Sequence, residues 1–165
     1  CRDYHIQMPM QSAFIGWKQE PDEYLARILG HDRLEKLNPI KTFRDHDIVV
    51  SFGSDAPCTT PDPIAWMDKA VNNGNAGQAV SVQDALRMCT CNGAWAAFDE
   101  RERGSLEAGK IADMAVLSEN PYTVPKDKIK DIRVERLYLG GKPYESCREG
   151  ILPMMFRGLT SRNKA

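Results

Sequence analysis

The chain of 165 residues lacks three features that would each indicate a particular class of protein: an excess of one charge, a long apolar run and a dense set of cysteines. Its 22 Lys and Arg offset 23 Asp and Glu, which leaves a net charge of −1. Proteins that bind nucleic acid need a basic surface, so no nucleic-acid partner is expected. No apolar segment approaches the roughly 20 residues that cross a bilayer, so no membrane partner is expected either.

The five cysteines are odd in number and widely spaced. A secreted disulfide framework would be denser and usually even in number. The pattern therefore favours reduced thiols and a cytoplasmic location, and the close pair Cys89 and Cys91 is interpreted as small buried residues on a helix. The chain begins with Cys1 and shows no apolar signal segment, so we expect a fragment of a longer protein.

The most informative stretch is the uncharged run Ile48–Phe52, which is followed by Gly53, Asp55 and Pro57. A short apolar run bounded by a turn signal is typical of a strand buried on both faces, as in a parallel sheet. In α/β folds, ligands and catalytic groups gather just beyond the carboxyl ends of such strands. Asp55 stands in that place and is the first candidate site residue.

A parallel βαβ unit is predicted to end with this run. Tyr4–Met8 is predicted to be its first strand, closed by Pro9. Two helical stretches follow, one that stops at Gly30 and one over Asp32–Asp45 that Pro39 interrupts. Strand, helix and strand within about 45 residues suit one parallel crossover.

Two further helices are predicted after the run. Asp62 followed by Pro63 is a strong helix start, because Asp caps free N–H groups and Pro fits the first helical position. Ser81 with Asp84 resembles a capping box and opens the second helix. Asn92-Gly93 is expected to end or kink that helix.

From residue 99 the pattern changes to β-strands. Ile111–Leu117 is predicted to be a strand, a slip of the apolar phase at Glu135-Arg136 predicts a β-bulge, and Gly140-Gly141 predicts a two-residue hairpin loop. We therefore expect an α/β domain over residues 1–98, an antiparallel β domain over 99–147 and a tail over 148–165.

Three segments of the chain together carry a family resemblance. They are the strand end Gly53–Pro57, the helix Ser81–Thr90 and the segment Gly104–Leu117. In this order and spacing they resemble the C-terminal part of the metal-dependent amidohydrolases, in particular amidohydrolase family 3, which includes N-substituted formamide deformylases and exoenzyme regulators. A Gly-Ser-Asp motif alone is weak, whereas three segments in register are specific. The resemblance covers about residues 1 to 145.

The resemblance implies an α/β fold that is the C-terminal portion of a (β/α)8 TIM barrel, about strands seven and eight with their helices, plus part of a small β-sandwich domain. Tyr4–Met8 would be strand seven and Ile48–Phe52 strand eight. A whole barrel takes roughly 250 residues, so the chain would hold about a quarter of one.

The resemblance also implies metal-dependent hydrolysis of non-peptide, amide-type C–N bonds in a small-molecule substrate. Asp55 would be both a metal ligand and the general base that takes a proton from the attacking water. The cofactor would be a divalent metal, with zinc the first choice, whose other ligands are absent from this chain. His5, His31 and His46 match none of the histidines that the family uses and are interpreted as structural.

Gln7 is a second candidate site residue. With the Met8-Pro9 that follows, it resembles the Gln-Pro that ends strand seven, which gives Gln7 a substrate-binding role; a strand-end hydrogen bond is the alternative. By the same resemblance, the loop Cys58–Pro63 would line the mouth of the pocket. The three tryptophans are interpreted as core residues.

Two other interpretations stay open. The parent could be a non-catalytic regulatory or binding protein that retains the fold, or the chain could be a free-standing α/β domain in which Asp55 caps a turn. The free-standing domain predicts a monomer with a sharp melting transition. A fragment, in contrast, would be inactive alone and would form a homo-oligomer or need the remainder of its parent chain, because a sheet cut after two strands leaves edges and faces uncovered.

Overall fold

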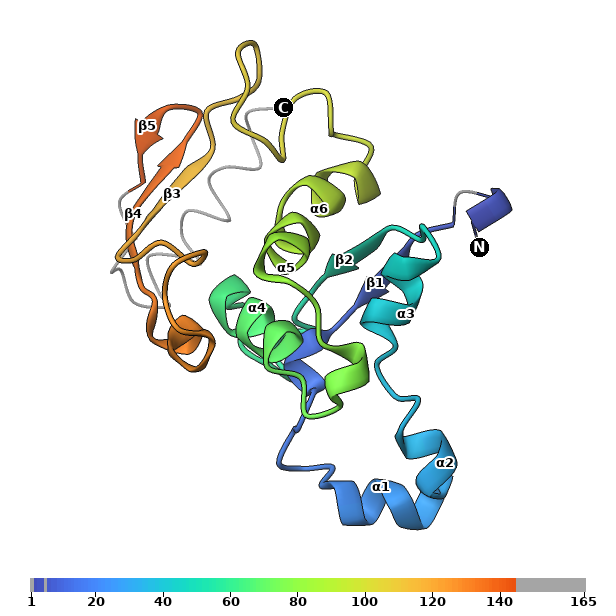
Figure 1. The fold of residues 1–165 in the computed structure, drawn as a ribbon. Coiled ribbons are helices and arrows are strands. Elements are labelled where there is room, and N and C mark those ends of the chain that lie inside the picture. Colours follow the sequence, from blue (N-terminus) through green and yellow to red (C-terminus); the bar gives the residue numbers. More distant parts are fainter. Residues whose placement is uncertain (1, 5, 145–165) are drawn as a thin grey trace, which may run out of the picture.

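The computed structural model describes residues 2–4 and 6–144, which form two β-sheets with helices beside them (Figure 1). The helices are α1 (Asp22–Leu29), α2 (His31–Leu34), α3 (Ile40–Asp45), α4 (Pro63–Val71), α5 (Val82–Cys89) and α6 (Cys91–Ala96). The strands are β1 (Met8–Met10), β2 (Val50–Phe52), β3 (Met114–Leu117), β4 (Val134–Leu139) and β5 (Lys142–Pro143). Short 3₁₀ helices cover Arg2–Tyr4, Ser12–Phe14, Ala76–Gln78 and Lys126–Asp131.

β1 and β2 pair in parallel, which confirms the predicted βαβ unit. Met8 lies opposite Val50, and Met10 lies opposite Phe52. The N–H of Met8 donates to Val49 O at 2.9 Å, and the carbonyl of Met10 accepts from Gly53 N at 3.0 Å. The second strand, Val50–Phe52, is shorter than the apolar run Ile48–Phe52.

The first strand lies further along the chain than the predicted Tyr4–Met8. Tyr4 ends a 3₁₀ helix, and β1 contains Pro9, the residue expected to close it. Proline lacks an N–H, so a strand tolerates it only where that group would not serve the ladder. The backbone N–H and C=O groups of Met8 and Met10 point toward β2, so those of Pro9 point to the opposite side of the strand. The missing N–H of Pro9 therefore removes no hydrogen bond between β1 and β2. His5 lies outside the described residues.

The hydrophobic core lies where this sheet meets the surrounding helices (Figure 1). Its buried apolar residues are Ile15, Ile40, Val50, Met67, Ala70, Val71, Val80, Ala85, Met88, Ile129 and Ile132. Full burial of one such large aliphatic side chain contributes about 1.5–3 kcal/mol. Ile129 and Ile132 come from the second half of the chain, so the two halves share this core.

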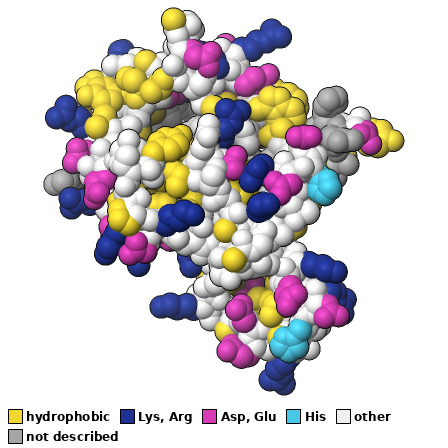
Figure 2. Space-filling view, viewed as in Figure 1, with side chains coloured by type: hydrophobic (Ala, Val, Ile, Leu, Met, Phe, Trp, Pro, Cys, Tyr) yellow, Lys and Arg dark blue, Asp and Glu magenta, His cyan; other side chains and the backbone are white. Residues whose placement is uncertain are grey.

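Helices α1 and α2 extend away from the rest of the molecule at the bottom of Figure 1. Neither helix contains a buried residue. α1 begins with Asp22 and Glu23 in its first turn and ends before Gly30, as predicted. On the face drawn in Figure 2, acidic and basic side chains are interspersed, in keeping with the balanced composition.

The predicted starts of α4 and α5 are confirmed. The carboxylate of Asp62 accepts hydrogen bonds from the N–H groups of Ile64 at 3.0 Å and Ala65 at 3.4 Å. Ser81 Oγ accepts from Asp84 N at 3.0 Å. These bonds satisfy N–H groups that the first turn of a helix leaves without a backbone partner.

The break after α5 falls at Thr90 rather than at the predicted Asn92-Gly93. Thr90 separates α5 from α6 and has φ −126° and ψ −90°, whereas Gly93 lies inside α6. The Thr90 hydroxyl donates to Leu86 O at 2.8 Å. A side-chain hydrogen bond back to the preceding turn competes with continuation of the helix, and β-branched residues favour such breaks.

β3, β4 and β5 form an antiparallel sheet. The predicted bulge is confirmed, because the register shifts opposite Val116-Leu117 and leaves Glu135 as the extra residue. The predicted hairpin is confirmed as well: Gly140 and Gly141 join β4 to β5 with φ of 57° and 76°. Positive φ at both positions is what a two-residue type I′ loop requires.

An ionic cluster joins the segment after α6 to this sheet. Arg103 pairs with Asp99 at 2.9 Å and with Asp113. The carboxylate of Asp113 also accepts from Gly140 N at 2.7 Å, at the hairpin loop. Because these groups are partly exposed, the cluster orients the segment more than it stabilises the fold.

Gly104 makes the closest backbone approach between this segment and α6. Its φ is +89°, and a Cβ built there would lie 2.6 Å from Ala94 Cβ and 3.1 Å from Cys91 Cα. The Cys91 thiol lies 3.0 Å from Gly104 O and donates to it. Only glycine fits this position without a shift of α6.

The predicted boundaries at 98 and 147 remain predictions, and the tail 148–165 lies outside the described residues. Within the described residues, no helix is both long enough and apolar enough to cross a membrane.

Candidate functional site

Asp55 follows β2 at its carboxyl end, where the sequence places it. The turn here is held by Ser54, whose Oγ accepts from Ala56 N at 3.1 Å and whose carbonyl accepts from the Thr59 hydroxyl. A backbone bond from Cys58 N to Asp55 O at 2.9 Å completes it. The turn therefore forms without the Asp55 side chain.

The Asp55 carboxylate is exposed and accepts no hydrogen bond from the described part of the chain. Its backbone has φ +53°, in the left-handed region that Asp and Asn tolerate better than most residues. The turn-capping role that the sequence left open belongs to Ser54. A carboxylate with no structural partner, at the edge where α/β folds collect ligands, is available to bind a cation or accept a proton.

The described residues do not by themselves form a metal site. A catalytic zinc needs three protein ligands and one open position. Over residues 2–4 and 6–144, no group of three or more His, Cys, Asp or Glu side chains lies together in a way that would hold an ion. His31 and His46 are exposed at helix ends and belong to no such group. Asp55 is suited to be one oxygen ligand, and a complete metal site would need further ligands in addition to it.

A cavity of about 600 Å³ opens against the loop that follows Asp55. It is lined by the loop residues 56–61, by Ala13 and Trp17, and by Ala65 and Lys69 of α4. Residues 58–61 of the loop predicted to line the substrate pocket line this cavity. The sequence predicts a core position for Trp17, whereas its side chain is half-buried and forms part of the cavity wall.

The walls of this cavity are held by specific contacts. Ser12 is buried and its hydroxyl donates to Trp66 O at 3.0 Å, which fixes the first 3₁₀ helix after β1 against α4. The Trp66 indole N–H donates to Thr60 O at 3.2 Å and anchors the loop. The rings of Phe14 and Trp17 meet edge to face, with centroids 4.8 Å apart.

Gln7 lies at the opposite end of the parallel sheet from Asp55, because it precedes β1. Its Nε2 donates to Ala96 O at 3.1 Å, while its Oε1 is buried and has no hydrogen-bond partner among the residues described. This contact is the strand-end hydrogen bond that the sequence offered as an alternative. The substrate-binding role of Gln7 stays a prediction.

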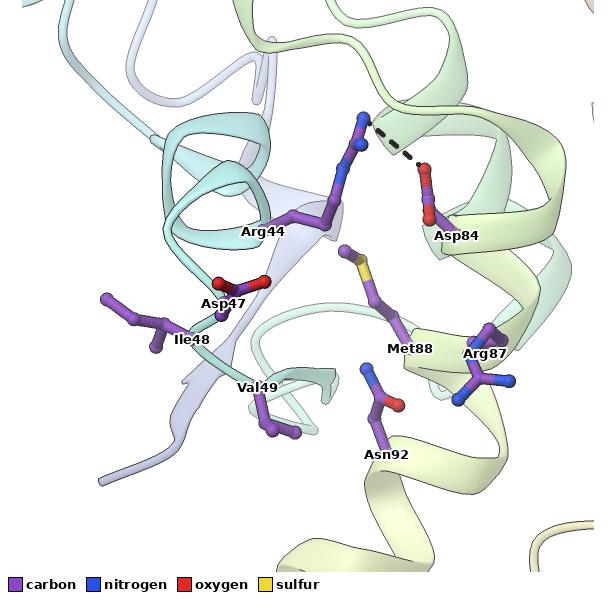
Figure 3. Close-up of a pocket in the computed structure, with 8 residues that line it drawn as sticks. All are labelled: Arg44, Asp47, Ile48, Val49, Asp84, Arg87, Met88 and Asn92. Atoms are coloured by element: carbon purple, nitrogen blue, oxygen red, sulfur yellow. Dashed lines mark ion pairs between the residues drawn. The ribbon is translucent and has the colours of Figure 1, made fainter. Parts of the chain in front are cut away.

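A second cavity of about 240 Å³ lies at the amino end of β2, between α3 and α5 (Figure 3). Arg44 pairs with Asp84 across it at 3.4 Å, along the dashed line in Figure 3. Asn92 Nδ2 donates to Val50 O at 2.7 Å and so ties α6 to the strand. These polar groups serve the packing of helix on sheet, and no residue predicted for the site lies among them.

The cysteines offer a direct test of the packing around α5. In the described part of the chain, Cys58, Cys89 and Cys91 are free thiols, and Cys58 is exposed. Burial raises the pKa of the Cys89 thiol to about 12. Because the thiolate is the nucleophile, we expect native Cys89 to react with iodoacetamide at pH 8 about 10³-fold more slowly than an ordinary thiol.

Peptide mass spectrometry after timed alkylation measures this difference, with Cys58 as the internal reference. Alkylation in concentrated urea should remove the protection of Cys89, because unfolding exposes it. Equal labelling of Cys58 and Cys89 in the native protein would contradict the packing described for α5.

The chain is similar to known protein families and relatives over most of its length. The model of the amidohydrolase family matches residues 3–144. An N-substituted formamide deformylase from Arthrobacter pascens is 35% identical over 135 residues, which are 78% of this chain and 23% of that protein. The chain thus spans less than a quarter of the length of this curated relative.

Solved structures resemble the fold as well. An uncharacterized metal-dependent hydrolase from Pyrococcus furiosus has a TM-score of 0.58 and 25% identity, over 67% of this chain and 23% of the other. An adenosine deaminase from Xanthomonas campestris with bound Zn has a TM-score of 0.58 and 19% identity, over 76% of this chain and 33% of the other, and shows a shared fold alone. Because the family match extends over residues 3–144, the chain belongs to the amidohydrolase family.

Proposed function

We propose that this chain is part of a metal-dependent amidohydrolase that hydrolyses non-peptide, amide-type C–N bonds in small molecules, with Asp55 as metal ligand and general base. Family membership over residues 3–144 supports the reaction class. The name of the Arthrobacter relative, a deformylase of N-substituted formamides, supports the bond type. The observation that supports the role of Asp55 is that its carboxylate, just beyond β2, is exposed and accepts no hydrogen bond from the described residues.

Asp55 would perform the proton transfers of this reaction. A bound divalent ion supplies the activated water, because it lowers the pKa of that water toward 7. The Asp55 carboxylate would accept the proton of the water and pass it to the leaving nitrogen. Both tasks need carboxylate oxygens that no structural hydrogen bond engages, and the turn held by Ser54 leaves those of Asp55 free.

The remaining ligands would come from outside the described residues, since these hold no three-ligand group. Zinc is the proposed metal, because a catalytic zinc takes three protein ligands, among them carboxylate oxygens such as that of Asp55, and keeps one position open for water. We also propose a cytoplasmic location, which rests on the free cysteines.

In this proposal, β1 and β2 are strands seven and eight of a (β/α)8 barrel, and β3, β4 and β5 belong to a β-sandwich. Parallel pairing with a helical crossover is the pattern of such barrels and supports the assignment. Val134 and Leu139 on β4 are 51% and 48% exposed. The exposure of these apolar side chains supports the proposal that the remainder of a longer chain, or a second copy of this chain, packs against them.

Removal of the metal tests the proposal. We expect the whole protein to contain at least one divalent ion per chain by elemental analysis. Dialysis against a chelator should lower hydrolysis of N-substituted formamides by about 10²-fold or more, because the ion activates the nucleophile. Addition of Zn²⁺ should restore activity, and Mg²⁺, which prefers six oxygen ligands, should not.

A protein that hydrolyses these amides without any divalent metal would contradict the proposal. A protein with neither metal nor hydrolysis would support the regulatory alternative instead. The 165-residue chain alone is expected to be inactive in the same assay.

A further inference from the structure

The cavity beyond β2 combines an apolar wall with a single charged group. Trp17, Pro57 and Pro61 contribute rigid apolar surfaces, and Lys69 is the one charged residue in its lining. A volume of about 600 Å³ suits a small organic molecule. The lining begins at Ala56, the residue after Asp55, and Asp55 itself is not part of it.

Lys69 differs from the other half-buried lysines of the described chain, Lys41 and Lys110. Lys41 pairs with Asp45 at 2.5 Å, and Lys110 donates to Ser105 Oγ at 2.6 Å. Lys69 has no ion-pair or hydrogen-bond partner among residues 2–4 and 6–144. An ammonium group has three N–H donors, and without a protein partner those of Lys69 are available to an anion.

The charged end of Lys69 lies beside Gly16, which precedes Trp17 in the chain. Its Nζ is 3.7 Å from the point where a Cβ on Gly16 would stand. The hydrogen bond from Ser12 to Trp66 O holds this segment against α4, which carries Lys69. Trp17 and Lys69 therefore line the same cavity from two elements that are held to each other.

We propose that this cavity binds an organic carboxylate with an apolar, aromatic-sized body. The body would lie against Trp17 and the two prolines, and a carboxylate oxygen would accept a hydrogen bond from Lys69 Nζ. If the proposed function holds, on which this step rests, the amide substrate carries such a carboxylate, and Lys69 holds it beside the loop that follows Asp55.

A single lysine matches a single negative charge. A phosphate monoester carries close to two charges at neutral pH, so one ammonium group would leave part of that charge unpaired in an apolar cavity. A neutral apolar molecule would fill the cavity but would leave Lys69 without a partner. The lining therefore favours a monocarboxylate over both.

Calorimetric titration of the whole protein with phenylacetate and with 2-phenylethanol tests this inference. Both molecules have the same ring, neither contains an amide, and only phenylacetate is charged. We expect phenylacetate to bind about tenfold more tightly, the order of one hydrogen bond to a charged group. Lys69→Met should remove the preference, and Lys69→Arg should retain it. Lys18→Met, which alters an exposed lysine next to Trp17 that is outside the lining, should retain it too.

Equal affinities in the unaltered protein, or no binding of either molecule, would overturn the inference. A preference that survives Lys69→Met, or that Lys18→Met abolishes, would overturn it as well. Because no hydrolysis is measured, this outcome is independent of the proposed function: binding can fail while metal-dependent hydrolysis persists, and the reverse also holds.

Discussion

Asp55→Asn in the whole protein is expected to lower kcat for amide hydrolysis by about 10²–10⁴-fold, the range that a positioned general base contributes. Asn has the same shape but does not accept the proton of the attacking water and is a weaker metal ligand. The fold should be retained, because Asn tolerates the left-handed backbone of position 55, where φ is +53°. Steady-state kinetics and the metal content of each variant measure the effect.

Asp47→Asn is the matched control. Asp47 is also an exposed aspartate with a left-handed backbone, at φ +57°, but it precedes β2 and so stands at the opposite end of the sheet from Asp55. Its kcat is expected to stay within about twofold of the parent, since surface substitutions away from special features have small effects. Equal losses in both variants, or no loss in Asp55→Asn, would contradict the role assigned to Asp55.

Gly104→Ala is expected to lower the free energy of unfolding by about 2–4 kcal/mol. One part of this cost is the left-handed backbone, at φ +89°, which is unfavourable for alanine. The other part is steric, because the new Cβ would lie 2.6 Å from Ala94 Cβ, so α6 must move or the segment must detach. Urea denaturation followed by circular dichroism measures the change.

Gly109→Ala separates the two causes. Gly109 also has a left-handed backbone, at φ +95°, but no atom lies within 4 Å of its would-be Cβ. Its substitution should therefore cost only the backbone term, about 1 kcal/mol. If Gly104→Ala were no more destabilising than Gly109→Ala, the close approach of this segment to α6 would be wrong.

The features that the sequence predicted correctly depend on local chemistry. Asp62 and Ser81 cap α4 and α5 through bonds to N–H groups only two or three residues away. The hairpin at Gly140-Gly141 depends on the conformational freedom of the two glycines themselves. A reader of the sequence needs no knowledge of distant residues to find such features.

The errors came where a distant partner decides the outcome. The sequence before Met8 is more typical of a strand than Met8–Met10 is. β1 nevertheless forms at Met8–Met10, because these residues form backbone hydrogen bonds with β2 and because the side of Pro9 that lacks an N–H points away from β2. In the candidate site, too, one feature depends on the local sequence and another on distant residues. Asp55 could be found from its place after an apolar run. The cavity that Trp17 and Lys69 both line depends on the tertiary packing of α4 and carries no local signal.

The orientation of Pro9 has a consequence for any neighbour on the outer side of β1. At its central residue that side presents a carbonyl oxygen but no N–H. A neighbouring strand would have to donate an N–H hydrogen bond to the carbonyl oxygen of Pro9, and Pro9 has no N–H to donate to that strand. Two β1 segments laid alongside each other would bring acceptors together without hydrogens between them, so this border disfavours uncontrolled stacking of identical chains while it still admits a strand that supplies the missing donor.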